Sequence, residues 1–168
     1  VRLLAELGAN VNTPTSDGCT PAFIAAQEGH AEGVRLLAEL GADVETPAND
    51  GATPVYIAAQ EGHAQVVKVL AELGANVETP RDTGATPVCI AAQEDHEEVV
   101  RLLAELGAHV ETPDNDGWTP VFVAAWHGHA EVVRVLVELG ANIQTPMNTA
   151  ATPVWVAAGR GHVDVVRV

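Results

Sequence analysis

Apolar residues recur along this chain in two alternating patterns, each bounded by turn-forming residues. A short apolar stretch, Thr53-Pro54-Val55-Tyr56-Ile57-Ala58-Ala59, follows the turn Asn49-Asp50-Gly51. Threonine caps free backbone N–H groups and proline suits the first helical position, so this stretch predicts a short helix over Val55–Gln60. Its alanines would let another backbone approach closely.

The second pattern begins after Glu61-Gly62-His63, which breaks the first helix. Apolar residues then follow the i, i+3, i+4, i+7 spacing of an amphipathic helix, predicted here over Ala64–Leu73. Gly74 is expected to end it in the left-handed conformation. Residues 75–80 would then return the chain, extended, to the next turn.

The same two patterns repeat with a period of 33 residues. The Thr-Pro stretch recurs as Thr20–Ala26, Thr86–Ala92, Thr119–Ala125 and Thr152–Ala158. A fixed period of this length is typical of an all-α solenoid, in which each unit buries its apolar face against its neighbours. We divide the chain 1–168 into a partial unit, four full units and a truncated unit: 1–14, 15–47, 48–80, 81–113, 114–146 and 147–168.

The repeated pattern Gly-x-Thr-Pro-x-x-x-Ala-Ala-x-x-Gly-His-x-x-Val-Val-x-x-Leu-x-x-x-Gly-Ala-x-Val resembles the ankyrin repeat over the whole chain. This resemblance implies antiparallel helix pairs stacked into a curved array, with β-hairpin-like loops projecting at right angles. It also implies protein partners, bound by the hairpin tips and the concave face of the inner, shorter helices. Direct enzymatic activity is not expected.

The net charge of the chain limits the chemical class of partner that it is expected to bind. The formal net charge is −15, from 23 acidic and 8 basic side chains. Such a surface repels phosphate backbones and anionic lipid, so we expect no nucleic acid and no membrane as direct partners. A protein with a basic segment fits better, and Glu28, Glu45, Glu61, Glu78, Glu94 and Glu111 are predicted to line an acidic groove for it. Simple solubility is the alternative explanation of this charge.

The second helices carry acidic and basic residues three or four positions apart, which predicts a solvated outer face stabilised weakly by pairs within each helix. The pairs include Arg2–Glu6, Glu32–Arg35, Arg35–Glu39, Glu98–Arg101, Arg101–Glu105, Glu131–Arg134 and Asp164–Arg167.

Chemistry-bearing side chains form no predicted catalytic, metal or cofactor site. One histidine per repeat (His30, His63, His96, His129, His162) lies too far from the next to share an ion, and the resemblance assigns it a structural role. Cys19 and Cys89 suggest no disulfide framework, and Cys89 is expected to be a small buried hydrophobe. These features, with no secretory signal or transmembrane stretch, favour an intracellular, cytoplasmic location weakly.

Aromatic residues give the strongest candidate site. The fourth residue of the Thr-Pro stretch is Phe23, Tyr56, Cys89, Phe122 or Trp155, either packed along the inner helices or forming a partly exposed strip. The fourth full unit adds Trp118 in its hairpin and Trp126-His127 where earlier units have Gln-Glu. Tryptophan is enriched among binding hot spots. We therefore predict a protein-binding patch of Trp118, Phe122, Trp126 and His127, joined by Trp155 and Arg160.

Several residues depart from the pattern. Gly33 replaces a core valine in a second helix, and Asp95 replaces the glycine between helices. Ala150 stands where other hairpins have Gly18, Gly51, Gly84 and Gly117, so either it is strained or the last hairpin differs in shape.

The two ends lack the polar caps that solenoids need, which predicts a fragment of a longer array whose apolar ends fray or stack end to end on another copy. The leading function is a non-enzymatic protein-interaction module or scaffold. The alternatives are a targeting or accessory region of a larger enzyme, and a structural spacer without a specific partner.

Overall fold

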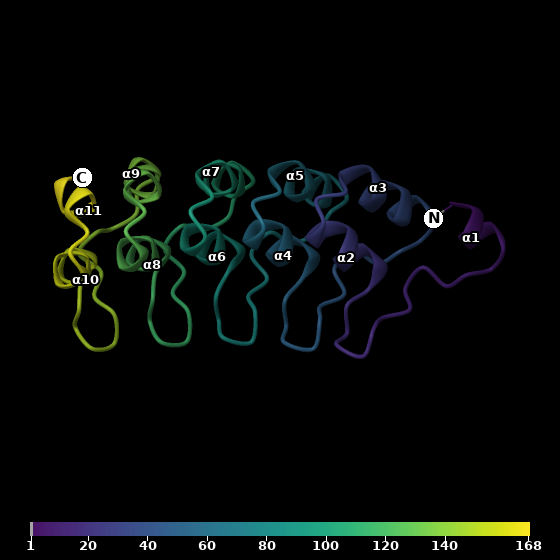
Figure 1. The fold of residues 1–168 in the computed structure, drawn as a ribbon, viewed down its shortest axis with the longest axis horizontal. Coiled ribbons are helices and arrows are strands. Elements are labelled where there is room, and N and C mark those ends of the chain that lie inside the picture. The colour runs from purple at the N-terminus through teal and green to yellow at the C-terminus, as the bar shows by residue number, and fades with distance from the viewer. Residues whose placement is uncertain (1) are drawn as a thin grey trace.

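The computed structural model describes residues 2–168, apart from the side chains of Arg2 and Ala5. These residues form an extended stack of helix pairs (Figure 1). The inner helices form one row: α2 Pro21–Gln27, α4 Pro54–Gln60, α6 Pro87–Gln93, α8 Pro120–His127 and α10 Pro153–Arg160. The outer helices form a second row: α3 Ala31–Glu39, α5 Ala64–Glu72, α7 Glu97–Glu105, α9 Ala130–Glu138 and α11 Val163–Arg167. A short helix, α1 Arg2–Glu6, precedes them.

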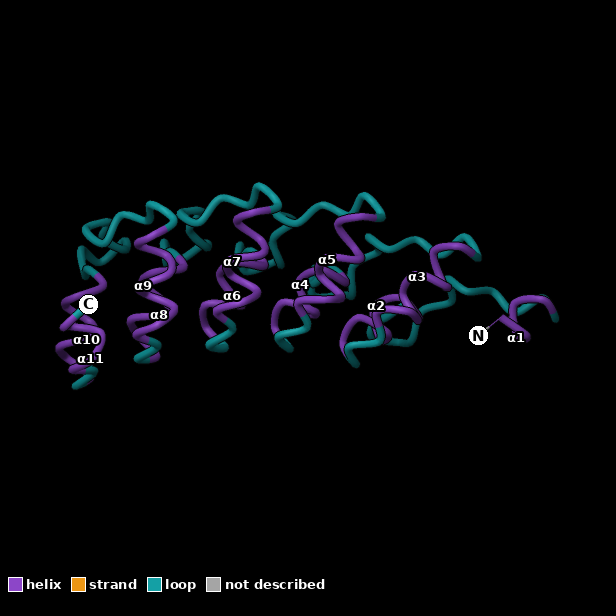
Figure 2. The backbone as a smooth tube through the Cα atoms, turned by 90° about the horizontal axis from the view of Figure 1, so that it is seen from above, coloured by secondary structure: helices purple, strands orange, loops and turns teal. Residues whose placement is uncertain are grey.

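The two rows run the length of the molecule, and loops project from the inner row away from the outer one (Figure 1). Seen from above, the helices lie side by side with their axes across the long direction of the array (Figure 2). Each inner helix contacts its own outer helix and the inner helices of the neighbouring pairs. The predicted all-α solenoid of stacked helix pairs is confirmed.

Local sequence explains where each inner helix begins. The Thr53 hydroxyl oxygen accepts a hydrogen bond from the backbone N–H of Tyr56 at 3.2 Å, and Pro54 occupies the first turn. This cap satisfies one of the N–H groups that a helix start leaves without an intrahelical partner. The equivalent bond forms at all five Thr-Pro sites.

The core is a continuous layer between the two rows, built from small and β-branched side chains. On the inner helices, Ala58 and Ala59 are completely buried, as are Val67 and Leu70 on the outer helix that they face. Alanine lets the helix backbones approach closely, while valine and leucine fill the space that remains. Because this layer passes from one pair to the next, each pair is stabilised by its neighbours.

The projecting loops are hairpin-like, although the structure assigns no strand within residues 2–168. In the second loop, the Ala48 N–H donates to the Ala52 carbonyl at 2.9 Å, and the Gly51 N–H donates to the Ala48 carbonyl at 3.0 Å. Neighbouring loops are also bonded, since the Asn49 N–H donates to the Asp17 carbonyl at 3.0 Å. The loops therefore form a connected row.

The repeating histidines join one helix pair to the next. His63 donates from Nε2 to the backbone carbonyl of Gln27 at 3.0 Å, and His96 donates to that of Gln60 at 2.9 Å. His129 and His162 make the same bond to Gln93 and Trp126. The predicted structural role of this histidine is confirmed for these four residues. The adjacent glycine is needed there, because a Cβ atom on Gly62 would lie 2.7 Å from the His96 ring.

Ion pairs on the outer helices include contacts that the sequence analysis missed. Glu131–Arg134 and Asp164–Arg167 form as predicted within their helices. Arg101, however, reaches Glu97 within α7 and also Glu138 on the next outer helix, at 2.9 Å. Arg35 likewise reaches Glu72 on α5 at 2.5 Å. The predicted Arg2–Glu6 pair lies outside the described atoms.

Both ends of the array expose apolar side chains. Leu3, Leu4 and Leu7 in and beside α1 are more than half exposed, and α1 stands apart from the other helices (Figure 1). A hollow of about 480 Å³, lined by Leu4, Ile24 and Gly33 among others, lies at this end. At the other end, Val154, Trp155, Val163 and Val166 are exposed.

The last hairpin keeps the shape of the others at the expense of backbone strain. Ala150 has φ +65°, and its N–H donates to the Met147 carbonyl at 2.9 Å, as the Gly117 N–H does to Asp114 in the preceding loop. Of the two alternatives left by the sequence, strain at Ala150 is therefore the one observed. Asp95 likewise takes φ +64° in place of a glycine.

We predict that Ala150→Gly stabilises the array by about 0.5–1 kcal/mol. Left-handed backbone costs an alanine about 1–2 kcal/mol relative to glycine, and the greater freedom of glycine in the unfolded chain offsets part of this gain. Circular dichroism during urea unfolding measures the midpoint, which is the urea concentration at which half of the protein is unfolded.

Gly117→Ala is the matched control and should lower the midpoint, because its φ is +84° and a Cβ atom would lie 2.8 Å from the Asn148 side-chain oxygen. An Ala150→Gly variant that unfolds at the same or a lower urea concentration would contradict the assignment of strain.

Candidate functional site

A hollow of about 440 Å³ lies where the first three projecting loops meet the inner helices α2 and α4. We call the surface between the loops and the inner helices, along the whole row of helix pairs, the groove. Cys19, Asp50 and Arg81 line this hollow from the loops, and Gln27 and Gln60 line it from the inner helices. Arg81 is held in place by Asp50, whose carboxylate lies 2.6 Å from its guanidinium.

In the fourth full unit, indole rings take the positions that line this hollow elsewhere. Trp118 replaces Cys19 and Ala52, and Trp126 replaces Gln27 and Gln60. The two indole centroids lie 4.9 Å apart, and both rings are only partly buried. The lining of the groove therefore changes from glutamine side chains at the N-terminal hollow to two indoles near α8.

Phe122 supports this aromatic surface from below. Its ring lies 5.2 Å from Trp118 in an edge-on arrangement and 6.4 Å from Trp126, but only 1% of the residue is exposed. The prediction that Phe122 forms part of the binding surface is corrected, because a buried ring cannot meet a partner. Phe122 instead fixes the tilt of the two indoles.

Arg160 extends the aromatic surface toward α10. Its guanidinium carbon lies 4.2 Å from the centroid of the Trp126 ring. An exposed contact of this kind contributes about 0.5–1 kcal/mol and holds the long side chain against the indole. The ion pairs that the structure describes within residues 2–168 include none with Arg160. Its charge therefore faces solvent at the edge of the indoles.

His127 and Trp155 lie at the margins of this cluster. His127 is exposed, donates from Nδ1 to the Val123 carbonyl at 3.0 Å and stacks on His129 with centroids 5.8 Å apart. Trp155 is 66% exposed at the C-terminal end of the array, and no described ring contact joins it to Trp118 or Trp126. We name Trp118, Trp126 and Arg160 the aromatic patch.

The other residues at the fourth position of the Thr-Pro stretch are mostly buried in the core. Phe23, Tyr56 and Cys89 are each at most 5% exposed, so the packing interpretation holds for these positions and for Phe122. An exposed strip along the inner helices is not formed by them. The exposed side chain of Trp155 is the exception.

Three of the six carboxylates predicted to line an acidic groove also bind the neighbouring loop. Glu45 accepts the backbone N–H of Asn76 at 2.6 Å, and Glu78 accepts that of His109 at 2.7 Å. Glu111 accepts the backbone N–H of Asn142 in the same way. The His109 backbone N–H, with smaller contributions from its side chain, holds the pKa of the Glu78 carboxyl below its usual value. These three carboxylates therefore join successive loops, a contact that the prediction did not include.

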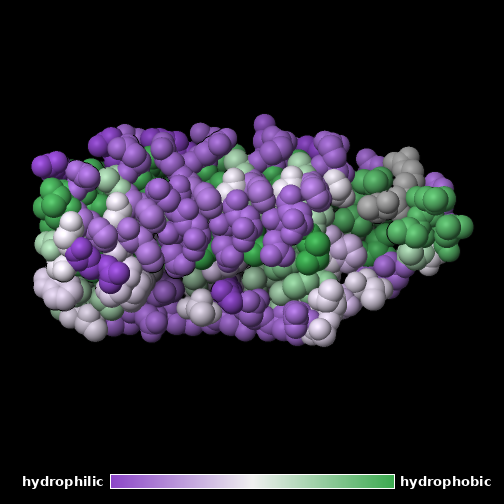
Figure 3. Space-filling view, viewed as in Figure 1, coloured by the Kyte–Doolittle hydropathy of each residue, from purple (hydrophilic) through white to green (hydrophobic). Residues whose placement is uncertain are grey.

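The other three predicted carboxylates are exposed. Glu28, Glu61 and Glu94 follow the last residues of α2, α4 and α6, and Gln60 and Gln93 donate side-chain hydrogen bonds to Glu61 and Glu94. The face that Figure 3 shows is hydrophilic over the middle of the array, while hydrophobic side chains gather at the α1 end. An acidic edge of the groove therefore remains in the first three full units.

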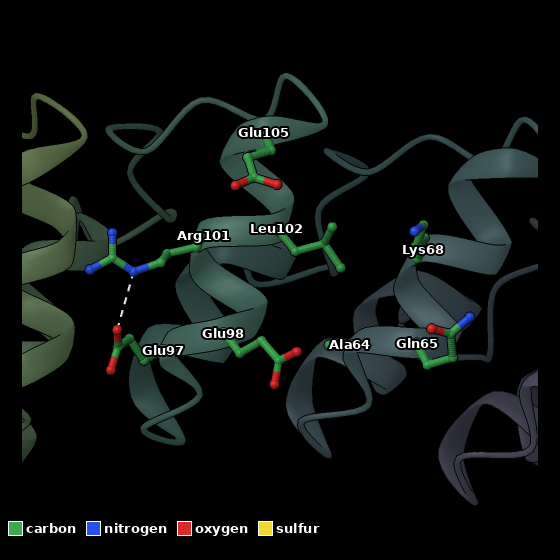
Figure 4. Close-up of a pocket in the computed structure, with 8 residues that line it drawn as sticks. All are labelled: Ala64, Gln65, Lys68, Glu97, Glu98, Arg101, Leu102 and Glu105. Atoms are coloured by element: carbon green, nitrogen blue, oxygen red, sulfur yellow. Dashed lines mark hydrogen bonds and ion pairs between the residues drawn. The ribbon is translucent and has the colours of Figure 1, made fainter.

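A second groove, of about 780 Å³, lies on the outer face between α5 and α7 (Figure 4). Lys68 and Gln65 line it from α5, and Glu98, Leu102 and Glu105 line it from α7, while Arg101 points away toward α9. Lys68 occupies the position at which Arg35 and Arg101 bridge neighbouring helices. At this groove, none of the ion pairs described for residues 2–168 joins α5 to α7.

The described side chains offer little chemistry for catalysis. Burial raises the pKa of the Cys89 thiol to about 12, so the nucleophilic thiolate is scarce at neutral pH. Among the described residues, no group of three His, Cys, Asp or Glu side chains could hold a metal ion. Within the same residues, no helix is long and apolar enough to cross a bilayer.

The geometry defines a class of protein: a helix-pair solenoid with a connected row of projecting loops. The family model described as ankyrin repeats (3 copies) matches residues 1–81 and again residues 76–147. The chain therefore belongs to the ankyrin-repeat family, whose arrays are typically non-enzymatic protein-interaction modules. No curated protein matches it at the threshold of the comparison.

We predict that the two cysteines differ in reactivity. In the native chain at neutral pH, iodoacetamide should modify Cys19, which is partly exposed, and leave Cys89 unmodified because its thiol is buried and protonated. Peptide mass spectrometry measures both sites.

Modification in 8 M urea (about the concentration needed to unfold such an array) should reach both thiols, which controls for reagent access. Equal native rates at Cys19 and Cys89 would show that α6 opens readily or that Cys89 is not buried.

Proposed function

We propose that this array is an interaction module that binds a protein segment in the groove between its loops and inner helices, with the aromatic patch as the anchor. The observation that carries the proposal is the pair of partly exposed indoles, 4.9 Å apart and supported by the buried ring of Phe122. A partner that covers both indoles removes apolar surface from water at a rigid site, which is how hot spots contribute affinity.

The position of the patch supports this proposal over a purely structural role. The second and third full units stack in the same array with Ala52 and Gln60, or Ala85 and Gln93, in place of the two tryptophans. Stacking therefore does not require indoles at these sites. A structural spacer gives no reason for two large aromatic side chains at the groove surface.

Other parts of the proposal rest on composition. The net charge of −15 supports a partner with a basic segment and makes nucleic acid an unsuitable partner. The free thiols of Cys19 and Cys89 suit a reducing, cytoplasmic compartment. An accessory role beside a catalytic domain is the alternative, and it would use the same groove to bring a substrate protein close.

We predict that Trp118→Ala with Trp126→Gln weakens binding at least about tenfold. These substitutions give the fourth unit the residues of the second and third units, so the fold should persist while the apolar anchor is lost. Peptides selected against the native array from a displayed random library, then measured by calorimetry, provide the ligands.

Gln65→Ala with Glu98→Ala is the control, because it truncates two exposed side chains on the outer face, away from the groove, and it should change affinity less than twofold. Circular dichroism verifies the helix content of each variant. If the selected peptides bind the tryptophan variant as tightly as the native array, the patch is not the anchor.

End-to-end association is a separate proposal for the apolar ends. The exposed Leu3, Leu4 and Leu7 at one end and Val154, Trp155 and Val166 at the other support it. We predict mass-action self-association in sedimentation velocity, weakened by Trp155→Glu. Strict monomers at about 100 μM, with the terminal helices protected from amide exchange, would contradict it.

A further inference from the structure

One position of the repeat carries a charge that changes sign along the groove. It is the second residue after the conserved Ala-Ala, at the C-terminal end of each inner helix. Its occupants in chain order are Glu28, Glu61, Glu94, His127 and Arg160. All five are exposed. We call this series the charge ladder.

The charged side chains of the ladder are not neutralised by ion pairs within the described part of the chain. The ion pairs described for residues 2–168 include none of Glu28, Glu61, Glu94 or Arg160, although many of the other basic side chains are paired. Hydrogen bonds from Gln60 and Gln93 hold two of the carboxylates at 3.1 and 2.8 Å. Arg160 is held over Trp126. The ladder thus presents oriented charges to solvent.

Successive ladder positions are separated by one helix-to-helix step. Packed helices lie about 8–10 Å apart. A segment in the polyproline II conformation advances about 3.1 Å per residue with three residues per turn, so every third side chain lies on the same side. Every third residue of such a segment laid along the groove would therefore meet one ladder position. A helical segment advances only 1.5 Å per residue and would need about six residues for each step.

We propose that the groove binds a protein segment in the polyproline II conformation whose charges run opposite to the ladder. Basic residues at every third position meet Glu28, Glu61 and Glu94, an apolar residue covers Trp118 and Trp126, and an acidic residue about three positions further meets Arg160. This inference rests on the proposed function for the apolar anchor and adds the chemistry and placement of the partner. Exposed ion pairs are individually weak, so the ladder acts mainly on register and association rate.

Two synthetic 13-residue peptides test this inference. The first has lysine at positions 1, 4 and 7, leucine at 10 and glutamate at 13, separated by serine and alanine. The second has the same composition, with lysine and glutamate moved out of the three-residue register. At about 50 mM salt the first should bind the native array about tenfold more tightly by calorimetry. The difference should shrink at 1 M salt, where the screening length falls to about 3 Å.

A protein variant with the ladder inverted provides the matched control. Glu28→Arg, Glu61→Arg, Glu94→Arg and Arg160→Glu all change exposed side chains, so the helix content should persist. This variant should prefer a third peptide, with glutamate at positions 1, 4 and 7 and lysine at 13. A nitroxide at the acidic end of the first peptide should broaden NMR signals near Arg160 and leave those near Glu28 sharp.

The outcomes separate the ladder from the anchor. If the first two peptides bind equally and both lose affinity in the Trp118→Ala, Trp126→Gln variant, the ladder inference is wrong while the proposed anchor stands. If the preference follows the ladder but ignores the two tryptophans, the anchor is wrong and the ladder stands. If no peptide binds the native array measurably, the ladder inference is overturned, and the library selection still tests the anchor.

Discussion

The contact between neighbouring helix pairs is the interaction on which this structure depends. Each inner helix has only seven or eight residues, which is too short to be stable alone in water. Burial of alanine and valine against the next pair provides the apolar part of the contact. The histidine ring adds a directional part, because it donates to a carbonyl of the preceding pair at about the same place in each repeat. A hydrogen bond of this kind contributes about 0.5–1.5 kcal/mol, and its regular recurrence fixes how pairs stack.

Features that depend only on residues close in the sequence could be predicted from the sequence. Thr53 and Pro54 mark a helix start by themselves, and a glycine such as Gly74 marks an end, since each acts on its own backbone. The histidines could be given a structural role because their spacing made a shared metal site unreasonable. The resemblance to the family then supplied the arrangement of the helix pairs. These predictions needed no knowledge of distant contacts.

The contacts between helix pairs that were missed from sequence span about one repeat. Arg35 meets Glu72, 37 residues later, and Glu45 meets the Asn76 backbone, 31 residues later. Pairing within a helix was predicted for Arg35, and a partner-facing role was predicted for Glu45, because only near neighbours were considered. The 33-residue period itself held the signal. Glu45, Glu78 and Glu111 each stand just before the Thr-Pro pair of a return loop, and each accepts the equivalent backbone N–H in the next unit. The burial of Phe122 was undecided because the sequence does not show how its ring packs against Trp118 and Trp126.

A consequence for function follows from how many recurring side chains the stacking uses. The threonine caps start the inner helices, and the alanines pack between helices. The histidines and the three loop carboxylates form hydrogen bonds to neighbouring units. A change at any of these positions therefore disturbs the array. The positions left over are those whose side chains end in the groove, and they are also where the units differ most. Trp118, Trp126 and the charge ladder belong to this set. An array built in this way can alter its partner by substitution at these positions while the contacts between pairs stay the same, which is why we assign recognition to the variable residues and stability to the repeating ones.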